Sequence, residues 1–165
     1  MGMVREEKLL VKEGNYGKGA FAADDFKKGQ IICALGGSTH QRDEMPKKDT
    51  KKTVRYVQIG RKFYLHISGN GDYLNHSCNP NAGLVIKGTN VKLKAIKNIK
   101  RGDEVTFDYS TTMNEDEYEL SCHCGNTNCR KTIRDFKYLP ITIRKKYVRM
   151  GIVPLYILEV IKNKH

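Results

Sequence analysis

Short apolar runs separated by glycine, proline and asparagine recur along most of the chain, and this pattern predicts a protein built mainly of short β-strands. Strands are expected over 8–13, 20–23, 31–35, 54–59, 62–67, 82–86, 91–96 and 105–109. Turn residues such as Gly60-Arg61 and Gly88-Thr89-Asn90 join successive runs in the manner of hairpins. The run over 31–35 is continuously apolar, which predicts a strand buried on both faces.

The pattern changes in two places. Residues 36–53 are rich in lysine and read as an exposed insert with at most one short helix, and a helical turn is expected over 115–118. Near the C-terminus, helices are predicted over 141–149 and 154–162, separated by Gly151 and Pro154. We expect these helices to pack back on the domain through Leu139, Ile141, Ile143, Val148, Val153, Leu155 and Ile157. The fold class is therefore α+β, mostly β, with a helical C-terminal tail.

The composition fits one folded domain. The chain has 165 residues, of which 39% are hydrophobic and 29% charged, which is too apolar for a disordered protein. No run approaches the roughly 20 apolar residues of a membrane span, and the N-terminus lacks the apolar core of a secretory signal. We expect no membrane association and an intracellular location, cytoplasmic or nuclear and chromosomal.

Charge narrows the choice of partners. The net charge is +12, and basic residues concentrate in 47–62, 92–101 and 130–164. Such a surface can contact nucleic acid or a protein bound to nucleic acid. A lysine-rich surface that only keeps the protein soluble explains the charge equally well.

The cysteines indicate a metal site. Three of the five lie in the pattern Cys122-x-Cys124-x4-Cys129, and structural zinc takes four thiolate or imidazole ligands. His123 is a poor fourth ligand because its backbone must turn between two others. Cys78 is the better candidate, and Cys33 remains its competitor. The alternative, unrelated buried cysteines, is disfavoured because a core strand does not carry this spacing.

The stretch from Asp72 to Asn81, Asp-Tyr-Leu-Asn-His-Ser-Cys-Asn-Pro-Asn, is unusually dense in short polar side chains. Alone it fits a surface loop as well as a functional site. A zinc ion shared by Cys78 and the downstream cysteines would pin this stretch to the tail, which favours the site.

Four motifs in fixed order then resemble the SET-domain protein lysine methyltransferases of compact, microbial type. They are Gly17-Lys18-Gly19, the run from Asn75 to Asn81, the run Gly-Asp-Glu-Val-Thr-Phe-Asp-Tyr ending at Tyr109, and the post-SET cysteines followed by Arg130. The resemblance covers about residues 5–135. It implies a SET domain over 5–113, a post-SET zinc-binding segment over 114–135 and a basic helical extension over 136–165. The implied fold has small curved sheets around a knot-like crossing, where the Tyr109 segment lies beside Asn75-His76.

The resemblance also implies S-adenosylmethionine as cofactor and structural Zn²⁺ as metal. The cofactor-binding residues it implies are Lys18, Gly19, Tyr73, Asn75, His76 and Tyr109, and the zinc ligands are Cys78, Cys122, Cys124 and Cys129. Many family members carry an Arg-Phe pair where this chain has Asp72 and Tyr73, so this chain lacks the arginine of those members.

Tyr109 is the expected catalytic residue. A lysine amine has a reference pKa of about 10.4 and must lose a proton before it attacks the methyl group. A neutral phenol can orient that amine without trapping it as an ion pair. In the family a tyrosine at the position of Phe107 limits the space for added methyl groups, so the phenylalanine implies di- or trimethylation.

Two functions remain at the level of sequence. The first is methylation of a protein lysine, with a histone or another DNA-packaging protein as the substrate. The second is a zinc-stabilised basic module that binds nucleic acid or a DNA-bound protein and has lost catalysis. The presence of Tyr109, Asn75 and His76 together favours the enzyme. A free histone tail would be repelled by a protein of this charge, so a substrate carried on DNA fits better.

Overall fold

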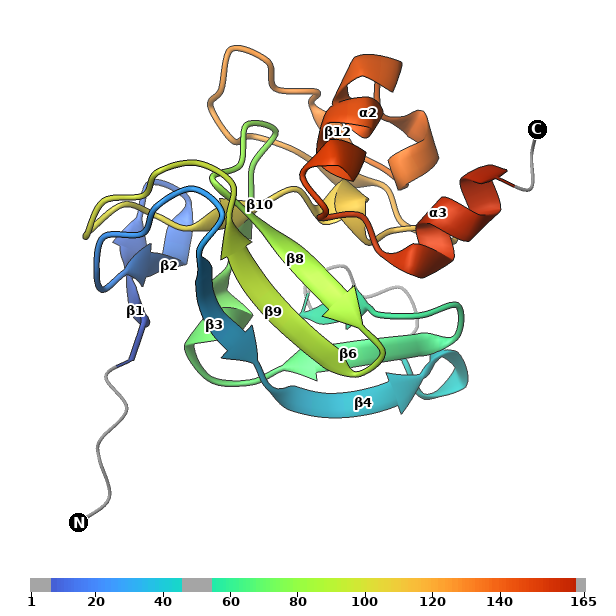
Figure 1. The fold of residues 1–165 in the computed structure, drawn as a ribbon, viewed down its shortest axis with the longest axis horizontal. Helices are drawn as coiled ribbons and strands as arrows, with labels where there is room; N and C mark the ends of the chain where they lie inside the picture. The colour runs from blue at the N-terminus through green and yellow to red at the C-terminus, as the bar shows by residue number, and fades with distance from the viewer. Residues whose placement is uncertain (1–6, 46–54, 163–165) are drawn as a thin grey trace.

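The computed structural model describes residues 7–45 and 55–162, which form short strands followed by two helices (Figure 1). The helices are α2 (Ile141–Arg149) and α3 (Leu155–Lys162), and single 3-10 turns span Arg42–Glu44, Gly69–Tyr73, Tyr109–Thr111 and Phe136–Tyr138. The strands are β1 (Leu9–Gly14), β2 (Gly17–Ala22), β3 (Ile31–Leu35), β4 (Gly37–Gln41), β5 (Tyr56–Gln58), β6 (Phe63–Ile67), β7 (Asn75–His76), β8 (Ala82–Lys87), β9 (Asn90–Ala95), β10 (Thr106–Phe107), β11 (Leu120–Ser121) and β12 (Thr132–Ile133). The predicted mostly β class is confirmed.

The described strands form five small sheets. Two have three strands, in the orders β3-β9-β8 and β4-β6-β5, and the other three are the pairs β1-β2, β7-β10 and β11-β12. The hairpins β5-β6 and β8-β9 lie where the glycine-rich turns predicted them. The sheets enclose a main core of buried aliphatic side chains, which includes Leu84, Leu93 and Val105.

The pair β7-β10 brings two distant motifs together. The strands are parallel, with Asn75 opposite Thr106 and His76 opposite Phe107. The amide of Ser77 extends the pairing by donating to the Phe107 carbonyl at 3.1 Å. Antiparallel neighbours can be joined by a tight turn, but parallel neighbours need a long connection, here provided by β8 and β9. This pairing places the Tyr109 segment beside Asn75-His76, as the family resemblance implied.

The C-terminal helices pack on the domain through a second core. Phe136, Tyr147, Ile152 and Ile157 are buried there together with Ile96, the residue that follows β9. Part of the predicted contact set is wrong, because Ile141, Val148 and Leu155 are exposed. The buried face of α2 is instead centred on Tyr147, which has a polar hydroxyl and gave no apolar signal in the sequence.

Three other local predictions are wrong. Ile31, at the start of β3, is 44% exposed, so this strand is not buried on both faces. Residues 37–41 form β4, a polar strand held by backbone pairing with β6, where an irregular insert was expected. Residues 115–118 form no helical turn, and Asp116 has a φ of 56°, a left-handed conformation that interrupts a right-handed helix.

Part of the predicted basic insert, residues 46–54 with Lys47, Lys48, Lys51 and Lys52, lies outside the described residues. Among the helices that are described, none combines the length and apolar character needed to cross a membrane.

Candidate active site and metal centre

Asn75 joins three of the sequence motifs. Its side-chain amide donates to the carbonyl of Lys18 at 3.1 Å and to Oε1 of Glu104 at 2.8 Å. The same carboxylate lies so close to Gly19 that a Cβ atom at this position would collide with it. A side chain at position 19 would therefore displace the Glu104 carboxylate from its bond with Asn75. Glu104 was not predicted as a site residue.

His76 is held by bonds at both ring nitrogens. Nδ1 accepts a hydrogen bond from the Tyr109 amide at 3.2 Å, and Nε2 lies 3.3 Å from Sγ of Cys78. Burial lowers the pKa of His76 to about 4, although the nearby Asp108 opposes the shift. The ring is therefore neutral at pH 7, with its proton on Nε2, the nitrogen that faces Cys78.

Tyr109 sits between His76 and Phe107. Its ring packs edge-on against His76 at 5.4 Å and tilted against Phe107 at 4.8 Å, measured between ring centroids. The hydroxyl donates to the Leu74 carbonyl at 2.8 Å. Burial raises the pKa of Tyr109, and the charges of Asp72 and Glu104 raise it further. The phenol therefore stays neutral and retains oxygen lone pairs that can accept a hydrogen bond.

Two cavities meet at Tyr109. The first, here called the narrow cavity, has a volume of about 60 Å³, and its walls include Tyr56, Tyr64, Phe107, Tyr109 and Leu120. The second, the wide cavity, has a volume of about 630 Å³ and is lined by Tyr16, Asn75, His76, Tyr109, Glu119, Leu120, Ser121, Cys122, His123, Cys124 and Ile133. Tyr109 and Leu120 belong to both walls.

The remaining predicted cofactor residues lie outside these walls. Lys18, Gly19 and Tyr73 line neither cavity. Lys18 is adjacent to the site through its carbonyl, which Asn75 holds, and Tyr73 packs against the main core. The structure therefore brings Asn75, His76, Phe107 and Tyr109 together and leaves Tyr73 on the core side.

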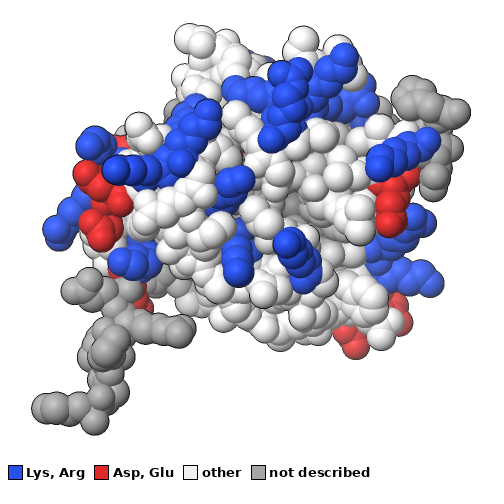
Figure 2. Space-filling view, viewed as in Figure 1, with Lys and Arg blue, Asp and Glu red and all other residues white. Residues whose placement is uncertain are grey.

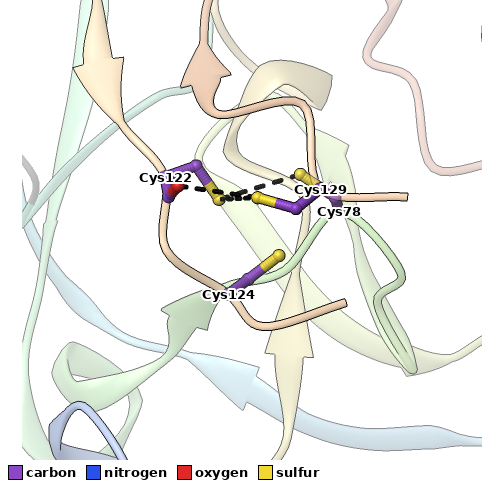
Figure 3. Close-up of side chains that lie close together, drawn as sticks. All are labelled: Cys78, Cys122, Cys124 and Cys129. Atoms are coloured by element: carbon purple, nitrogen blue, oxygen red, sulfur yellow. Dashed lines mark hydrogen bonds between the residues drawn. The ribbon is translucent and has the colours of Figure 1, made fainter. Parts of the chain in front are cut away.

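The four predicted metal ligands converge (Figure 3). The Sγ atoms of Cys78, Cys122, Cys124 and Cys129 all lie within 4.8 Å of one another, and their side chains point toward a common centre. Cys122 lies 3.8 Å from Cys78 and 3.7 Å from Cys129. Zinc with Zn–S bonds of about 2.3 Å in a tetrahedron separates its sulfur ligands by about 3.8 Å, so the donor set fits zinc. The competitor Cys33 packs instead against the main core.

Further bonds attach the cysteine segment to the polar stretch. Asn126 donates to the Ser77 hydroxyl at 3.0 Å, and Asn128 donates to the Cys78 carbonyl at 3.1 Å. The Arg130 amide points at Sγ of Cys78 from 3.4 Å. A donor aimed at sulfur stabilises a thiolate, which is the form that binds metal.

Asp108 is the buried centre of the site and was not predicted. Its side chain is fully buried and accepts bonds from Nη2 of Arg130 at 2.7 Å and from the Tyr147 hydroxyl at 3.0 Å. Ser110 adds a backbone donor at 3.1 Å. Asp108 directly precedes Tyr109, so its carboxylate links the cysteine segment and α2 to the segment that carries Tyr109.

Comparisons with known proteins agree with this geometry. Residues 17–110 match the SET domain family. The chain is 31% identical over 162 residues to the histone-lysine N-methyltransferase mes-4 of Caenorhabditis elegans, a match covering 81% of this chain and 17% of that protein. It is 30% identical over 134 residues to the human histone-lysine N-methyltransferase 2D, covering 74% of this chain and 2% of that protein. The chain thus spans a small part of each relative's length.

A solved structure supports the fold. KRYPTONITE in complex with mCHG DNA and SAH superposes with a TM-score of 0.60 at 23% identity, covering 78% of this chain and 29% of that chain. KRYPTONITE has also been solved with mCHH DNA, an H3(1-15) peptide and SAH, with a TM-score of 0.55 at 22% identity and coverage of 76% and 29%. At these identities the likeness concerns the fold alone.

Proposed function

Because the chain belongs to the SET-domain family, we propose that it is an S-adenosylmethionine-dependent protein lysine N-methyltransferase. The observation that carries this proposal is the meeting of a wide and a narrow cavity at Tyr109. A volume of about 630 Å³ lies within the usual range of small-molecule sites, about 300–1,000 Å³. The narrow cavity suits an unbranched side chain such as that of lysine.

The cofactor would supply an electrophilic methyl group bound to a sulfonium. Tyr109, in the wall common to both cavities, is placed to orient a lysine amine toward that methyl group. Since the Tyr109 proton is committed to the Leu74 carbonyl, the oxygen can accept an N–H bond from the amine. Alignment of the two reactants, more than acid or base chemistry, would then supply the rate.

Asn75 and His76 would act mainly through their backbone. The side-chain donors of Asn75 are held by Lys18 and Glu104, and both nitrogens of His76 have partners within the chain. Their side chains therefore fix the shape of the wide cavity. The main-chain groups of this segment, together with the cysteine segment opposite, are left to hold the cofactor.

Zinc bound by Cys78, Cys122, Cys124 and Cys129 would complete the wide cavity. Cys122 and Cys124 also line that cavity, so the metal would fix one of its walls. A structural zinc site contributes to folding directly, with apparent binding free energies of about 10–16 kcal/mol in small zinc domains.

The product is proposed to be di- or trimethyllysine. Phe107 lines the narrow cavity and is 3% exposed, and its ring brings no hydroxyl to the space beside Tyr109. A hydroxyl here would hold water in the volume that added methyl groups must occupy.

The proposed substrate is a histone or another DNA-packaging protein carried on DNA, which would place the protein at chromatin. Relatives are named as histone-lysine N-methyltransferases, and the fold neighbour was solved with DNA and an H3 peptide. The net charge of +12 supports a substrate whose own positive charge is neutralised by DNA.

Transfer of labelled methyl groups tests the proposal. Zinc-loaded protein is incubated with labelled S-adenosylmethionine and either histones assembled on DNA or whole-cell lysate, with Tyr109→Phe in parallel. We expect labelled protein bands with the wild type and a loss of at least about 100-fold in the variant, the usual scale for a positioned catalytic group. Absence of label above the variant would favour the alternative, a binding module without catalysis.

A further inference from the structure

The narrow cavity carries charge of one sign. Carboxyl groups of Glu115 and Asp135 line it, and none of the described lysine and arginine side chains does. This contrasts with a chain of 30 Lys and Arg against 18 Asp and Glu. Asp135 is committed, because its Oδ2 accepts a bond from the Asp116 amide at 2.7 Å. Glu115 is the second carboxyl group in this wall.

Glu115 keeps surplus negative charge. Its side chain is 7% exposed, and Oε1 lies 2.9 Å from Nη1 of Arg42. The same guanidinium also pairs with Glu117 on the surface, so two carboxylates share one positive charge. Burial raises the pKa of Glu115, the bond to Tyr64 and the charge of Arg42 oppose the shift, and the charges of Glu117 and Asp135 add to it.

Tyr64 adds a polar group to the same cavity. Its side chain, on β6, is buried, and its hydroxyl is close enough to Glu115 that a hydrogen bond between the two lowers the pKa of the Glu115 carboxyl. A hydroxyl that donates to a carboxylate keeps oxygen lone pairs that can accept a further bond. The Tyr64 oxygen is therefore available to accept a bond from a group that enters the cavity.

The position of these two residues separates them from the methyl-transfer point. Tyr64 and Glu115 line the narrow cavity but not the wide one, whereas Tyr109 lines both. A side chain entering the narrow cavity would therefore meet Tyr64 and Glu115 away from the wall shared with the cofactor cavity.

We propose that Tyr64 and Glu115 are specificity-determining residues that capture the protonated amine of the incoming lysine. Glu115 attracts the charge, and the Tyr64 oxygen accepts an N–H bond. The proposal rests on the proposed function for the assignment of the narrow cavity to lysine. Capture precedes loss of the proton, so this pair acts on substrate binding. A carboxylate beside Tyr109 would instead hold the ammonium at the point where a free amine is needed.

Titration with a small amine tests the capture site without knowledge of the protein substrate. The probe is n-butylammonium, which mimics the end of a lysine side chain, and n-butanol is its neutral counterpart. Binding to zinc-loaded protein is followed by NMR. Since a hydrogen bond to a charged group is worth about tenfold or more in affinity, we expect wild-type protein to bind the ammonium about tenfold more tightly than the alcohol. Glu115→Gln should reduce this preference to within about twofold, and Tyr64→Phe should reduce it by about threefold.

Glu159→Gln is the matched control, because it removes an exposed carboxylate that pairs with Arg61 and does not line the narrow cavity. It should keep the preference. Equal binding of the two probes by the wild type, or an equal loss in Glu159→Gln and Glu115→Gln, would overturn the capture site. Tyr64→Phe removes only the hydroxyl and keeps the buried ring, so a change in its binding preference is not caused by unfolding. Ammonium preference without any methyl transfer would support the capture site and overturn only the proposed function.

Discussion

Single side chains in this protein hold several segments at once, and Cys78 is the clearest case. Its sulfur lies 3.8 Å from Cys122, 3.4 Å from the Arg130 amide and 3.3 Å from Nε2 of His76. His76 in turn accepts the amide proton of Tyr109. His76 therefore contacts both the proposed metal ligand Cys78 and the proposed catalytic residue Tyr109.

Cys78→Ser should accordingly reduce both metal content and cofactor affinity. Zinc measured by mass spectrometry after dialysis should fall well below one equivalent, and calorimetry should show S-adenosylmethionine binding weakened by at least about tenfold. Cys33→Ser is the control, since Cys33 packs against the main core, and it should retain both properties. Normal zinc content in Cys78→Ser would contradict the ligand assignment.

Phe107→Tyr should narrow the product distribution toward monomethyllysine. The ring centroids of Phe107 and Tyr109 are 4.8 Å apart, so the added hydroxyl would enter the narrow cavity next to Tyr109 and would hold water there. Mass spectrometry of the reacted substrate measures the distribution. A wild type that adds a single methyl group under exhaustive conditions would contradict the proposed product.

At this scale the sequence identified residues whose chemistry is local. The cysteine spacing and the demand of zinc for a fourth ligand favoured Cys78, with Cys33 left as a competitor, and the structure brings Cys78 into the cluster. Glu104 and Asp108 were not found, because ordinary acidic residues become site residues only through partners that are far away in the chain. Asp108, for example, is defined by Arg130 and Tyr147.

Among the secondary-structure elements, helices α2 and α3 each contribute a tyrosine hydroxyl that contacts residues of the site. The Tyr147 hydroxyl on α2 donates to Asp108, and the Tyr156 hydroxyl on α3 lies within hydrogen-bond distance of the carbonyl oxygens of Gln58 and Thr112, at 2.8 and 2.5 Å, with one proton to donate. Gln58 and Thr112 both line the narrow cavity. The C-terminal extension therefore supports the walls of the proposed lysine site.

Tyr147→Phe should destabilise the protein. It leaves one bond of a buried carboxylate unmade, which costs about 1–3 kcal/mol. Urea unfolding should show a lower midpoint with an unchanged slope. The control is Tyr138→Phe, whose hydroxyl bonds Asp116 at an exposed position and should change stability little. Equal midpoints for the two variants would argue against the bracing role.

Strands that are stabilised by local sequence could be predicted, whereas a strand that is stabilised by pairing with a distant segment could not. The hairpins β5-β6 and β8-β9 were predicted because alternating apolar residues and a turn encode them locally. Strand β4 was missed because its residues are polar, and its stability comes from pairing with β6, which lies more than twenty residues later. In that pairing the His66 carbonyl leaves no room for a Cβ on Gly37.

For the molecule as a whole, positive charge dominates one face. Figure 2 shows lysine and arginine spread over the side that carries α2 and the β8-β9 hairpin, with few acidic residues among them. The exposed basic residues of these elements are Lys87, Lys92, Lys145, Lys146 and Arg149. Burial lowers the pKa of Lys97, and the charge of Lys146 lowers it further, so positive charges crowd here. The narrow cavity, by contrast, has the carboxyl groups of Glu115 and Asp135 in its wall and no described lysine or arginine.

The concentration of lysine and arginine on this face predicts that it binds DNA. Lys145→Gln with Lys146→Gln should weaken binding to a short duplex and reduce the dependence of log K on log salt by up to about 1.8, since each neutralised phosphate contributes about 0.9. Fluorescence anisotropy at several salt concentrations gives both quantities. The double variant Lys8→Gln with Lys12→Gln removes equal charge from β1 and its flank, where Lys8 lies 3.7 Å from Asp24. Equal losses in the two double variants would indicate that net charge alone is responsible.

The wide cavity is lined both by residues that are synthesised early and by residues that are synthesised late. Tyr16 and Asn75 leave the ribosome early, whereas Cys124 and Ile133 leave late, and Tyr147 follows them. Because synthesis proceeds from the N-terminus, a nascent chain that ends before Cys129 lacks one of the four thiolates and also strand β12, without which the β11-β12 sheet cannot form. The proposed cofactor site is thus completed last, and a chain that ends before Cys129 lacks part of it.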